Sequence, residues 1–154
     1  MAQAVEANKN AFKLLQAGAP EQSVYWQDEE TGLNLRCRPD YLNSFCSDLK
    51  SCQSARPGAV SRDMYKLGYH ISAAHYTAGL LAATGRYHPF LFIFIEKTAP
   101  YLVAVYGLDD QSQAIAHDEY RRLLQRLADC LETDTWPGLE DNLNLSLPSY
   151  AFKD

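Results

Sequence analysis

The chain has 154 residues, of which 47% are hydrophobic, 12% aromatic and 21% charged. This composition is that of a folded chain with a core of its own, and it excludes disorder, collagen and coiled coil as descriptions of the whole molecule. The formal net charge of −5 gives no general attraction to nucleic acid, so DNA or RNA binding would need a local basic patch or a bridging metal. We expect one domain covering residues 1–154.

Neither membrane nor secretory segments are evident. The N-terminus lacks the apolar stretch of a signal peptide, and the longest apolar run, residues 90–95, is too short to cross a bilayer. No two cysteines form a CxxC pair, which argues against a zinc ribbon or a thioredoxin-like site. We therefore expect a cytoplasmic protein with reduced thiols and no contact with a membrane.

The first third of the chain predicts one helix and a β-hairpin. The helix spans residues 2–17, with Gly18 as its C-terminal stop. A strand over 23–27 and a turn over 28–32 follow, and the turn contains a glycine that can adopt positive φ. Apolar and polar residues alternate over 33–38, which indicates a second strand with one buried face.

The remainder predicts alternating helices and strands. Ser61 is expected to cap a helix that is interrupted at Gly68. The other predicted elements are a strand over 48–52, a helix over 69–83, strands over 90–96 and 101–108, and a last helix beginning at Asp109 or Asp110 with Ala116, Tyr120, Leu123, Leu127 and Cys130 at helical spacing. Helices and strands in this order predict an α/β fold, a mixed central sheet flanked by helices.

A candidate catalytic cluster lies around the third predicted strand. Residues i and i+2 of a strand share a face, so Asp48 and Lys50 should project side by side, with Asp40 a short crossover away. Two converging carboxylates can hold Mg²⁺, and an adjacent lysine can orient or deprotonate an attacking water. These groups suit metal-assisted phosphodiester hydrolysis. A surface ion pair beside a hairpin is the alternative interpretation of the same spacing.

Longer motifs give a resemblance to a known family. The segments GLNLRCRPDYL, SDLKSC, YHISAAHY, CLETDTWPG and LSLPSYA, in this order, resemble the nuclease domain of RecE-type exonucleases (exonuclease VIII), which belong to the PD-(D/E)xK nuclease superfamily. The similarity runs from about Phe12 to the C-terminus.

This resemblance implies a function and a set of site residues. The family degrades linear double-stranded DNA from the 5′ end with Mg²⁺, Mn²⁺ being an alternative. It works beside a single-strand annealing protein in phage or prophage recombination, and forms a ring-shaped homo-oligomer around DNA ends. By resemblance, Asp40 and Asp48 are metal ligands, Lys50 is the catalytic lysine, and Tyr76 is the tyrosine of a QxxxY motif.

Two departures from the family pattern support a different expectation. Ser72 stands where the QxxxY motif has glutamine, and the upstream helix that carries a further metal-site histidine in the family precedes the first residue of this chain. The alternative to an active exonuclease is therefore a catalytically impaired remnant that acts as a DNA-binding or assembly module.

Basic and aromatic residues around the cluster have two interpretations each. The basic side chains either grip DNA phosphates or form a solvated face; they are Arg36, Arg38, Arg56, Arg62 and Lys66. Aromatic rings can stack on bases, but packing is the expected role of Tyr25, Trp26 and Trp136. A structural role is likewise expected for His75.

Overall fold

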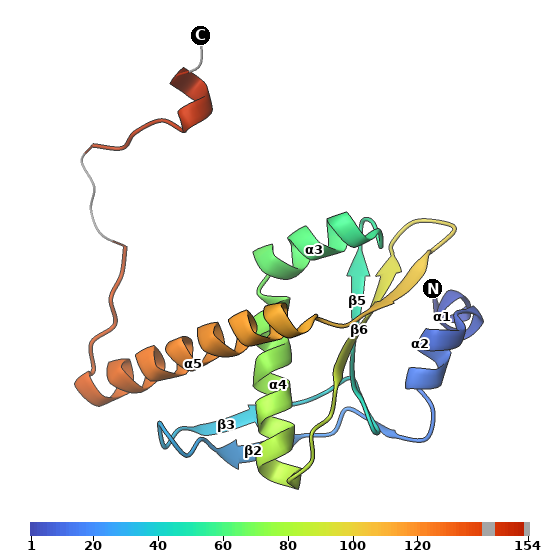
Figure 1. Ribbon diagram of the computed structural model, residues 1–154, viewed down its shortest axis with the longest axis horizontal. Coiled ribbons are helices and arrows are strands. Elements are labelled where there is room, and N and C mark those ends of the chain that lie inside the picture. The colour runs from blue at the N-terminus through green and yellow to red at the C-terminus, as the bar shows by residue number, and fades with distance from the viewer. Residues whose placement is uncertain (140–143, 153–154) are drawn as a thin grey trace.

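A five-stranded mixed sheet forms the centre of the protein, in the order β1-β4-β5-β6-β7. The computed structural model describes residues 1–139 and 144–152 (Figure 1). The sheet strands are β1 (Ala19–Pro20), β4 (Tyr41–Leu42), β5 (Cys46–Cys52), β6 (Phe90–Glu96) and β7 (Val103–Tyr106). The predicted α/β class with a mixed central sheet flanked by helices is confirmed.

The parallel pair β5–β6 is the core of this sheet. Strand β6 is apolar over nearly its whole length, and its central residues 92–95 are buried because both faces of the sheet are covered. A parallel pair cannot be closed by a hairpin, so the chain crosses over through α3 (Pro57–Lys66) and α4 (Tyr69–Thr84).

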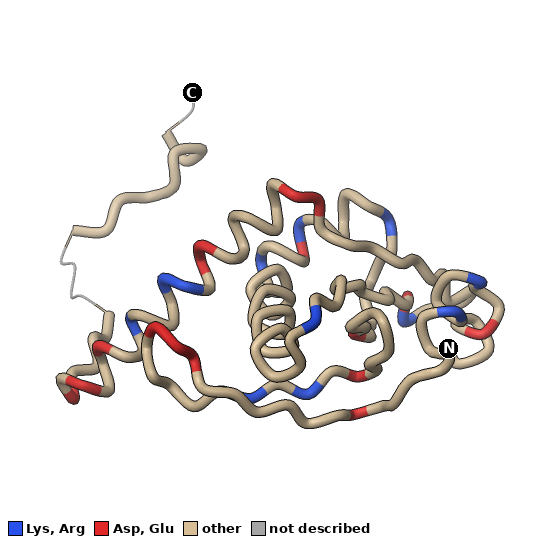
Figure 2. The backbone as a smooth tube through the Cα atoms, turned by 60° about the horizontal axis from the view of Figure 1, so that its bottom comes forward, with Lys and Arg blue, Asp and Glu red and all other residues tan. Residues whose placement is uncertain are grey.

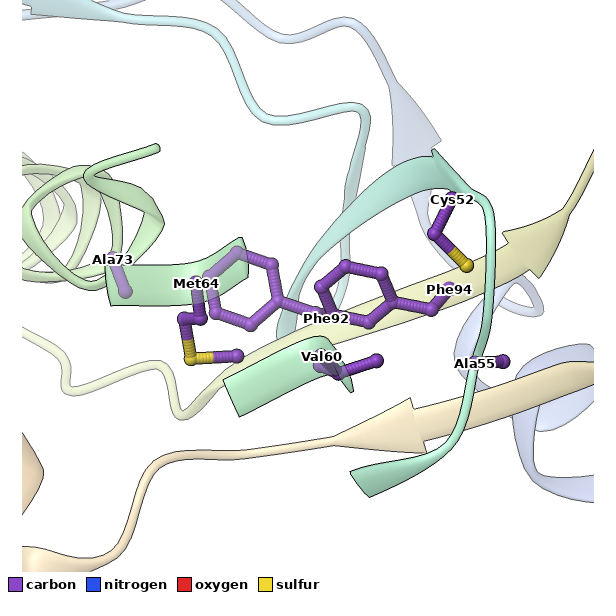
Figure 3. Packing of buried hydrophobic residues seen from close by; sticks show 7 residues of the cluster. All are labelled: Cys52, Ala55, Val60, Met64, Ala73, Phe92 and Phe94. Carbon is purple, nitrogen blue, oxygen red and sulfur yellow. The ribbon is translucent and has the colours of Figure 1, made fainter. Parts of the chain in front are cut away.

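Alternating residues of β6 supply the two halves of the core. Phe92 and Phe94 point toward α3 and α4, where they pack with Val60, Met64 and Ala73 (Figure 3). Ile93 and Ile95 point to the opposite face, where they pack under the two N-terminal helices. The helices therefore bury both faces of the central strands.

The N-terminal segment forms two short helices, so the predicted single helix over 2–17 is wrong. They are α1 (Ala2–Ala7) and α2 (Lys9–Leu14), separated by Asn8 in extended conformation. The Asn8 side chain accepts hydrogen bonds from the backbone N–H groups of Asn10 and Ala11, and donates one to the carbonyl of Val103 at 3.0 Å. The helix breaks at Asn8 because this side chain caps α2 and is also attached to β7. Since α2 ends at Leu14, Gly18 is not the helix stop that was predicted.

The other helices form where they were predicted, but α3 begins earlier than expected. Helix α3 begins at Pro57, whose missing N–H costs nothing in the first turn, so Ser61 lies inside the helix and is not its cap. Gly68 adopts φ of 69° between α3 and α4, as the predicted interruption requires. Asp109 caps the last helix, α5 (Asp110–Thr133), through the N–H of Ser112.

Helix α5 buries fewer apolar residues than its spacing predicts. Ala116, Tyr120 and Cys130 are buried, but Leu123 and Leu127 are 37% and 39% exposed. The buried face runs through Leu124 instead, which is 7% exposed, and Figure 1 shows the C-terminal half of α5 extending beyond α4. None of the helices in the described ranges has the length and apolar character needed to cross a bilayer.

The predicted hairpin forms, but as a ribbon separate from the main sheet. Strands β2 (Val24–Gln27) and β3 (Asn34–Cys37) pair only with each other and lie against α4 (Figure 1). The ring of Trp26 packs on Gly79, where a side chain would leave only 2.5 Å between its Cβ and the ring. Arg121 of α5 holds the turn through a paired contact with Asp28, 2.5 Å between the closest atoms.

Replacing Gly79 with alanine should loosen this ribbon. The added Cβ overlaps the Trp26 ring, and such overpacking costs about 1–3 kcal/mol, which exceeds the ~1 kcal/mol gained from helix propensity. Gly58→Ala in α3 is the matched control, because its Cβ would meet nothing closer than 3.9 Å. Urea denaturation should show Gly79→Ala less stable than both the wild type and Gly58→Ala; equal stability would contradict this packing.

The Asp28–Arg121 pair should make stability depend on pH. Arg121 and the Thr31 hydrogen bonds lower the pKa of Asp28 from 3.8 to about 2. A lowered folded-state pKa stabilises the fold above the unfolded pKa, and this contribution is lost as pH falls toward 2. We expect the free energy of unfolding of Asp28→Asn to be about 1–2 kcal/mol lower than that of the wild type at pH 7, and the difference to shrink below pH ~4. Glu29→Gln, which changes an exposed neighbour, should leave the urea midpoint unchanged at both pH values.

Candidate active site

Two residues of the candidate cluster lie on the same face of β5. The register pairs Asp48 with Phe92 and Lys50 with Phe94, so both side chains project toward α3 and α4. The Asp48 carboxylate is 2.5 Å from the Lys50 ammonium. The spacing argument from the sequence is therefore confirmed for this pair, and the pair lies beside the apolar core.

Asp40 reaches the same place from the neighbouring strand. Tyr41 of β4 pairs with Ser47 of β5, and one further step of this antiparallel register brings Asp40 opposite Asp48. The Asp40 carboxylate accepts a hydrogen bond of 2.8 Å from the backbone N–H of Leu49. Pro39, which precedes it, is fully buried and separates the ribbon from the sheet.

Burial and mutual attraction set the protonation of the pair. Burial raises the pKa of Asp48 in spite of the nearby ammonium, and Asp40 adds to the rise. Burial opposes the charge of Lys50 as well, but Asp48 and Asp40 together hold the pKa of its ammonium above the ordinary value. The desolvation cost therefore falls mainly on Asp48, whose side chain is 10% exposed against 27% for Lys50.

Helix α4 adds two tyrosines to the cluster. The Lys50 ammonium lies 5.2 Å from the centre of the Tyr69 ring, a cation–π contact that no sequence pattern predicted. Burial raises the pKa of Tyr76, and the charge of Asp48 contributes to the rise, so its hydroxyl lies within electrostatic range of the carboxylates. Ser72 is exposed and bonds back to its own helix, at 3.5 Å from the carbonyl of Gly68.

The donor atoms of the cluster fit a hard divalent cation. The Oδ2 atom of Asp48 is buried and, in the described part of the chain, has no hydrogen-bond partner of good geometry; it faces the Lys50 ammonium. Mg²⁺ takes oxygen ligands and is commonly held by one or two carboxylates with water completing its shell. Across residues 1–139 and 144–152 no group of three His, Cys, Asp or Glu side chains is placed to hold a metal. Asp40 and Asp48 thus fit Mg²⁺ or Mn²⁺ rather than a metal that needs four protein ligands.

The structure separates the predicted basic residues into two groups. Arg36 and Arg38 lie on β3 and just after it, beside a cavity of about 440 Å³ that Tyr76 also lines. Arg56, Arg62 and Lys66 belong to α3 or its first cap position and are exposed. No contact among the described residues connects this second group to the carboxylates, so DNA binding there stays a prediction.

Four aromatic or imidazole side chains around the cluster and in the tail differ in their environments. Trp26 packs as expected, and His75 has a structural contact, a 3.0 Å hydrogen bond between its Nε2 atom and the carbonyl of Arg36. Tyr25 is 67% exposed and Trp136 is 59% exposed, so the expectation that these two pack is wrong. The alternation of β2 was the missed signal, because adjacent residues of a strand point to opposite faces.

Comparison with known proteins places the chain in a family. Residues 1–145 match the model of a family described as PDDEXK-like domain of unknown function (DUF3799). The chain belongs to this family, which confirms the expected PD-(D/E)xK nuclease-like domain. No curated protein matches the chain.

A solved structure supports the same fold. It is that of a "putative exonuclease" from Eubacterium rectale, with a TM-score of 0.64 and 16% sequence identity. The match covers 92% of this chain and 61% of that protein, so this chain spans about three fifths of its neighbour's length. At this identity the likeness establishes the fold.

Divalent metal should stabilise the protein through the two carboxylates. A ligand that binds only the folded state at ten times its Kd adds about 1.4 kcal/mol to the free energy of unfolding, or about 3–6 °C in Tm for a chain of this size. We expect this rise with Mg²⁺ or Mn²⁺ for the wild type and not for the double variant Asp40→Asn, Asp48→Asn. A matched double variant, Glu29→Gln with Glu132→Gln, removes two exposed carboxylates and should respond as the wild type does. An equal rise in all three proteins would contradict the site.

Proposed function

We propose that the protein is a metal-dependent nuclease that hydrolyses phosphodiester bonds at the ends of linear double-stranded DNA. The observation that carries this proposal is the convergence of Asp40, Asp48 and Lys50 at one buried point of a PDDEXK-like fold. Asp40 and Asp48 would hold the metal. When bound, a divalent ion supplies Lewis-acid stabilisation of the phosphate and lowers the pKa of water.

The lysine acts as a cation in this scheme. In the metal-free protein, Asp48 and Asp40 outweigh the effect of burial and raise the pKa of Lys50, so its ammonium is protonated near neutral pH. Its role is then to orient water and to stabilise negative charge that develops on the phosphate. The ring of Tyr69 restrains the ammonium from one side.

Tyr76 contributes a neutral hydroxyl. Its raised pKa keeps the phenol protonated, so it can donate a hydrogen bond to a phosphate oxygen without adding negative charge to an already acidic site. Ser72 is exposed and bonds to its own helix, and so takes no part in this arrangement.

The finer properties follow from the resemblance to RecE-type exonucleases. On that basis the reaction runs 5′ to 3′ with Mg²⁺, in the cytoplasm, in recombination of the phage or prophage type beside a single-strand annealing protein. The same resemblance supports a ring-shaped homo-oligomer at DNA ends.

One observation favours a second candidate, a DNA-binding or assembly module without catalysis. In the described residues no third His, Cys, Asp or Glu is placed to complete a metal group with the two carboxylates. Ser72, at the motif position of the family's glutamine, bonds to its own helix and leaves that position without a side chain in the site. This candidate keeps the fold and the basic residues and loses only turnover.

An end-labelled linear duplex distinguishes the two candidates. We expect label release that requires Mg²⁺ or Mn²⁺ and falls by about 10²-fold or more in Lys50→Ala, because a preorganised charge at the reacting phosphate is lost. Lys97→Ala, which removes an exposed lysine beyond the end of β6, is the control and should retain full activity. A closed circular duplex should resist cleavage.

The contrary results are equally specific. Cleavage that survives Lys50→Ala, or that needs no metal, would contradict the proposed chemistry. DNA binding by the wild type without any cleavage, with metal present, would support the non-catalytic module instead.

A further inference from the structure

We propose that the exposed face of the β2–β3 ribbon binds a single strand of DNA, with Tyr25 stacking on a base and Arg36 and Arg38 contacting phosphates. This inference deepens the proposed function, on which it rests, by naming the form of DNA that lies next to the active site. It concerns a surface on which packing was expected and which the structure leaves open.

Strand register gathers the polar residues of the ribbon on one side. Tyr25 pairs directly with Arg36, and Trp26 pairs with Leu35. Because side chains alternate, every second residue faces solvent. The solvent face consists of exposed residues only: Ser23, Tyr25, Gln27, Asn34, Arg36 and Arg38.

The opposite side of the ribbon is already occupied. The Trp26 ring packs against Gly79, and the His75 ring forms a hydrogen bond with the carbonyl of Arg36. In the turn, Asp28 forms an ion pair with Arg121. These three anchors fix both ends and the middle of the ribbon on α4 and α5. The solvent face is thus a platform whose backbone is held in place.

The charge of this platform complements a phosphate backbone. Figure 2 shows Lys and Arg interspersed with Asp and Glu along the backbone, and the net charge of the chain is −5. Among the six solvent-facing residues of the ribbon, two are arginines and none is Asp or Glu. The Arg36 guanidinium has no ion pair within the described ranges. Arg38 pairs with Glu21 at 2.7 Å, but both side chains are more than half exposed, so a phosphate can displace this weak partner.

An aromatic ring between arginines selects a single strand over a duplex. Duplex DNA presents phosphates but keeps the faces of its bases stacked inside the helix. Tyr25, at 67% exposed, offers an open ring face on which any unpaired base of a strand can stack, whereas a duplex offers base faces only at its ends. Stacking of this kind tolerates any base, as an enzyme that acts on DNA without sequence preference requires.

The platform is continuous with the candidate active site. The cavity of about 440 Å³ is lined by Ser23, Tyr25, Arg36, Cys37, Arg38 and Tyr76. Tyr76 belongs to α4 and lies within electrostatic range of Asp48 and Asp40. A strand lying on the ribbon is therefore led past Tyr76 toward the carboxylates.

Binding without metal tests this surface separately from catalysis. Fluorescence anisotropy of a labelled single-stranded oligonucleotide in EDTA should give an affinity that falls roughly 10-fold or more in Tyr25→Ser and stays within about twofold in Tyr25→Phe. Tyr87→Ser, which removes another exposed tyrosine at 57%, is the matched control and should bind as the wild type does. A 2-aminopurine base in the oligonucleotide should be quenched by the wild type and not by Tyr25→Ser.

The phosphate contacts of the arginines can be tested through the salt dependence of the affinity for single-stranded DNA. Arg36→Gln should weaken binding and reduce the slope of log K against log salt by about 0.7, the value for one phosphate contact on a single strand. Arg126→Gln, on the exposed side of α5, should change neither quantity.

Separate results overturn this inference and the proposed function. Single-strand affinity and 2-aminopurine quenching that are unchanged in Tyr25→Ser would overturn the ribbon surface, even if the protein cleaves DNA. Equal loss of duplex and single-strand affinity in that variant would overturn the preference for a single strand. Tyr25-dependent binding by a protein that never cleaves would keep the surface and refute the nuclease.

Discussion

The parallel pairing of β5 with β6 is the constraint on which the structure depends. Two adjacent parallel strands with buried faces require a crossover, and α3 and α4 supply it. The same helices cover Phe92 and Phe94 and bring Tyr69 and Tyr76 to the face that carries Asp48. Core and candidate active site are therefore products of one topological requirement.

Placing the site beside the core has an electrostatic consequence. Asp48 is a carboxylate next to aromatic rings, and its burial disfavours the charged form. Lys50 offsets part of this cost, and a bound cation would offset more. Perturbed pKa values of this kind are common at functional sites, and a purely structural pair gains little from this degree of burial, so both support the proposed chemistry.

The β2–β3 ribbon shows how the fold joins the proposed binding surface to the candidate catalytic cluster. The ribbon shares no hydrogen-bonded ladder with the main sheet, and α4 is the element that joins them. One helix carries Gly79 and His75, which hold the ribbon, and Tyr76, which lies within electrostatic range of the carboxylates. The ribbon and part of the candidate site are therefore attached to the same helix, while Arg121 of α5 holds the ribbon turn.

Local signals in the sequence determined the elements whose causes are local. Strand β6 followed from its apolar run, the start of α4 from Gly68, and the start of α5 from Asp109. The expected pairing of Asp48 with Lys50 needed only the period of a strand. Contacts between distant segments decided the rest: Val103 holds Asn8 and breaks the N-terminal helix.

Only the tertiary structure decided which faces are open and which segments meet. Trp26 and Tyr25 are equally aromatic, and the presence of α4 on one side alone buries the first and exposes the second. Asp40 joins Asp48 because β4 pairs with β5 in one particular register. Burial and strand register depend on residues far apart in the chain. The sequence by itself therefore determined which chemical groups are available for a site, and only the tertiary structure determined which of them lie together.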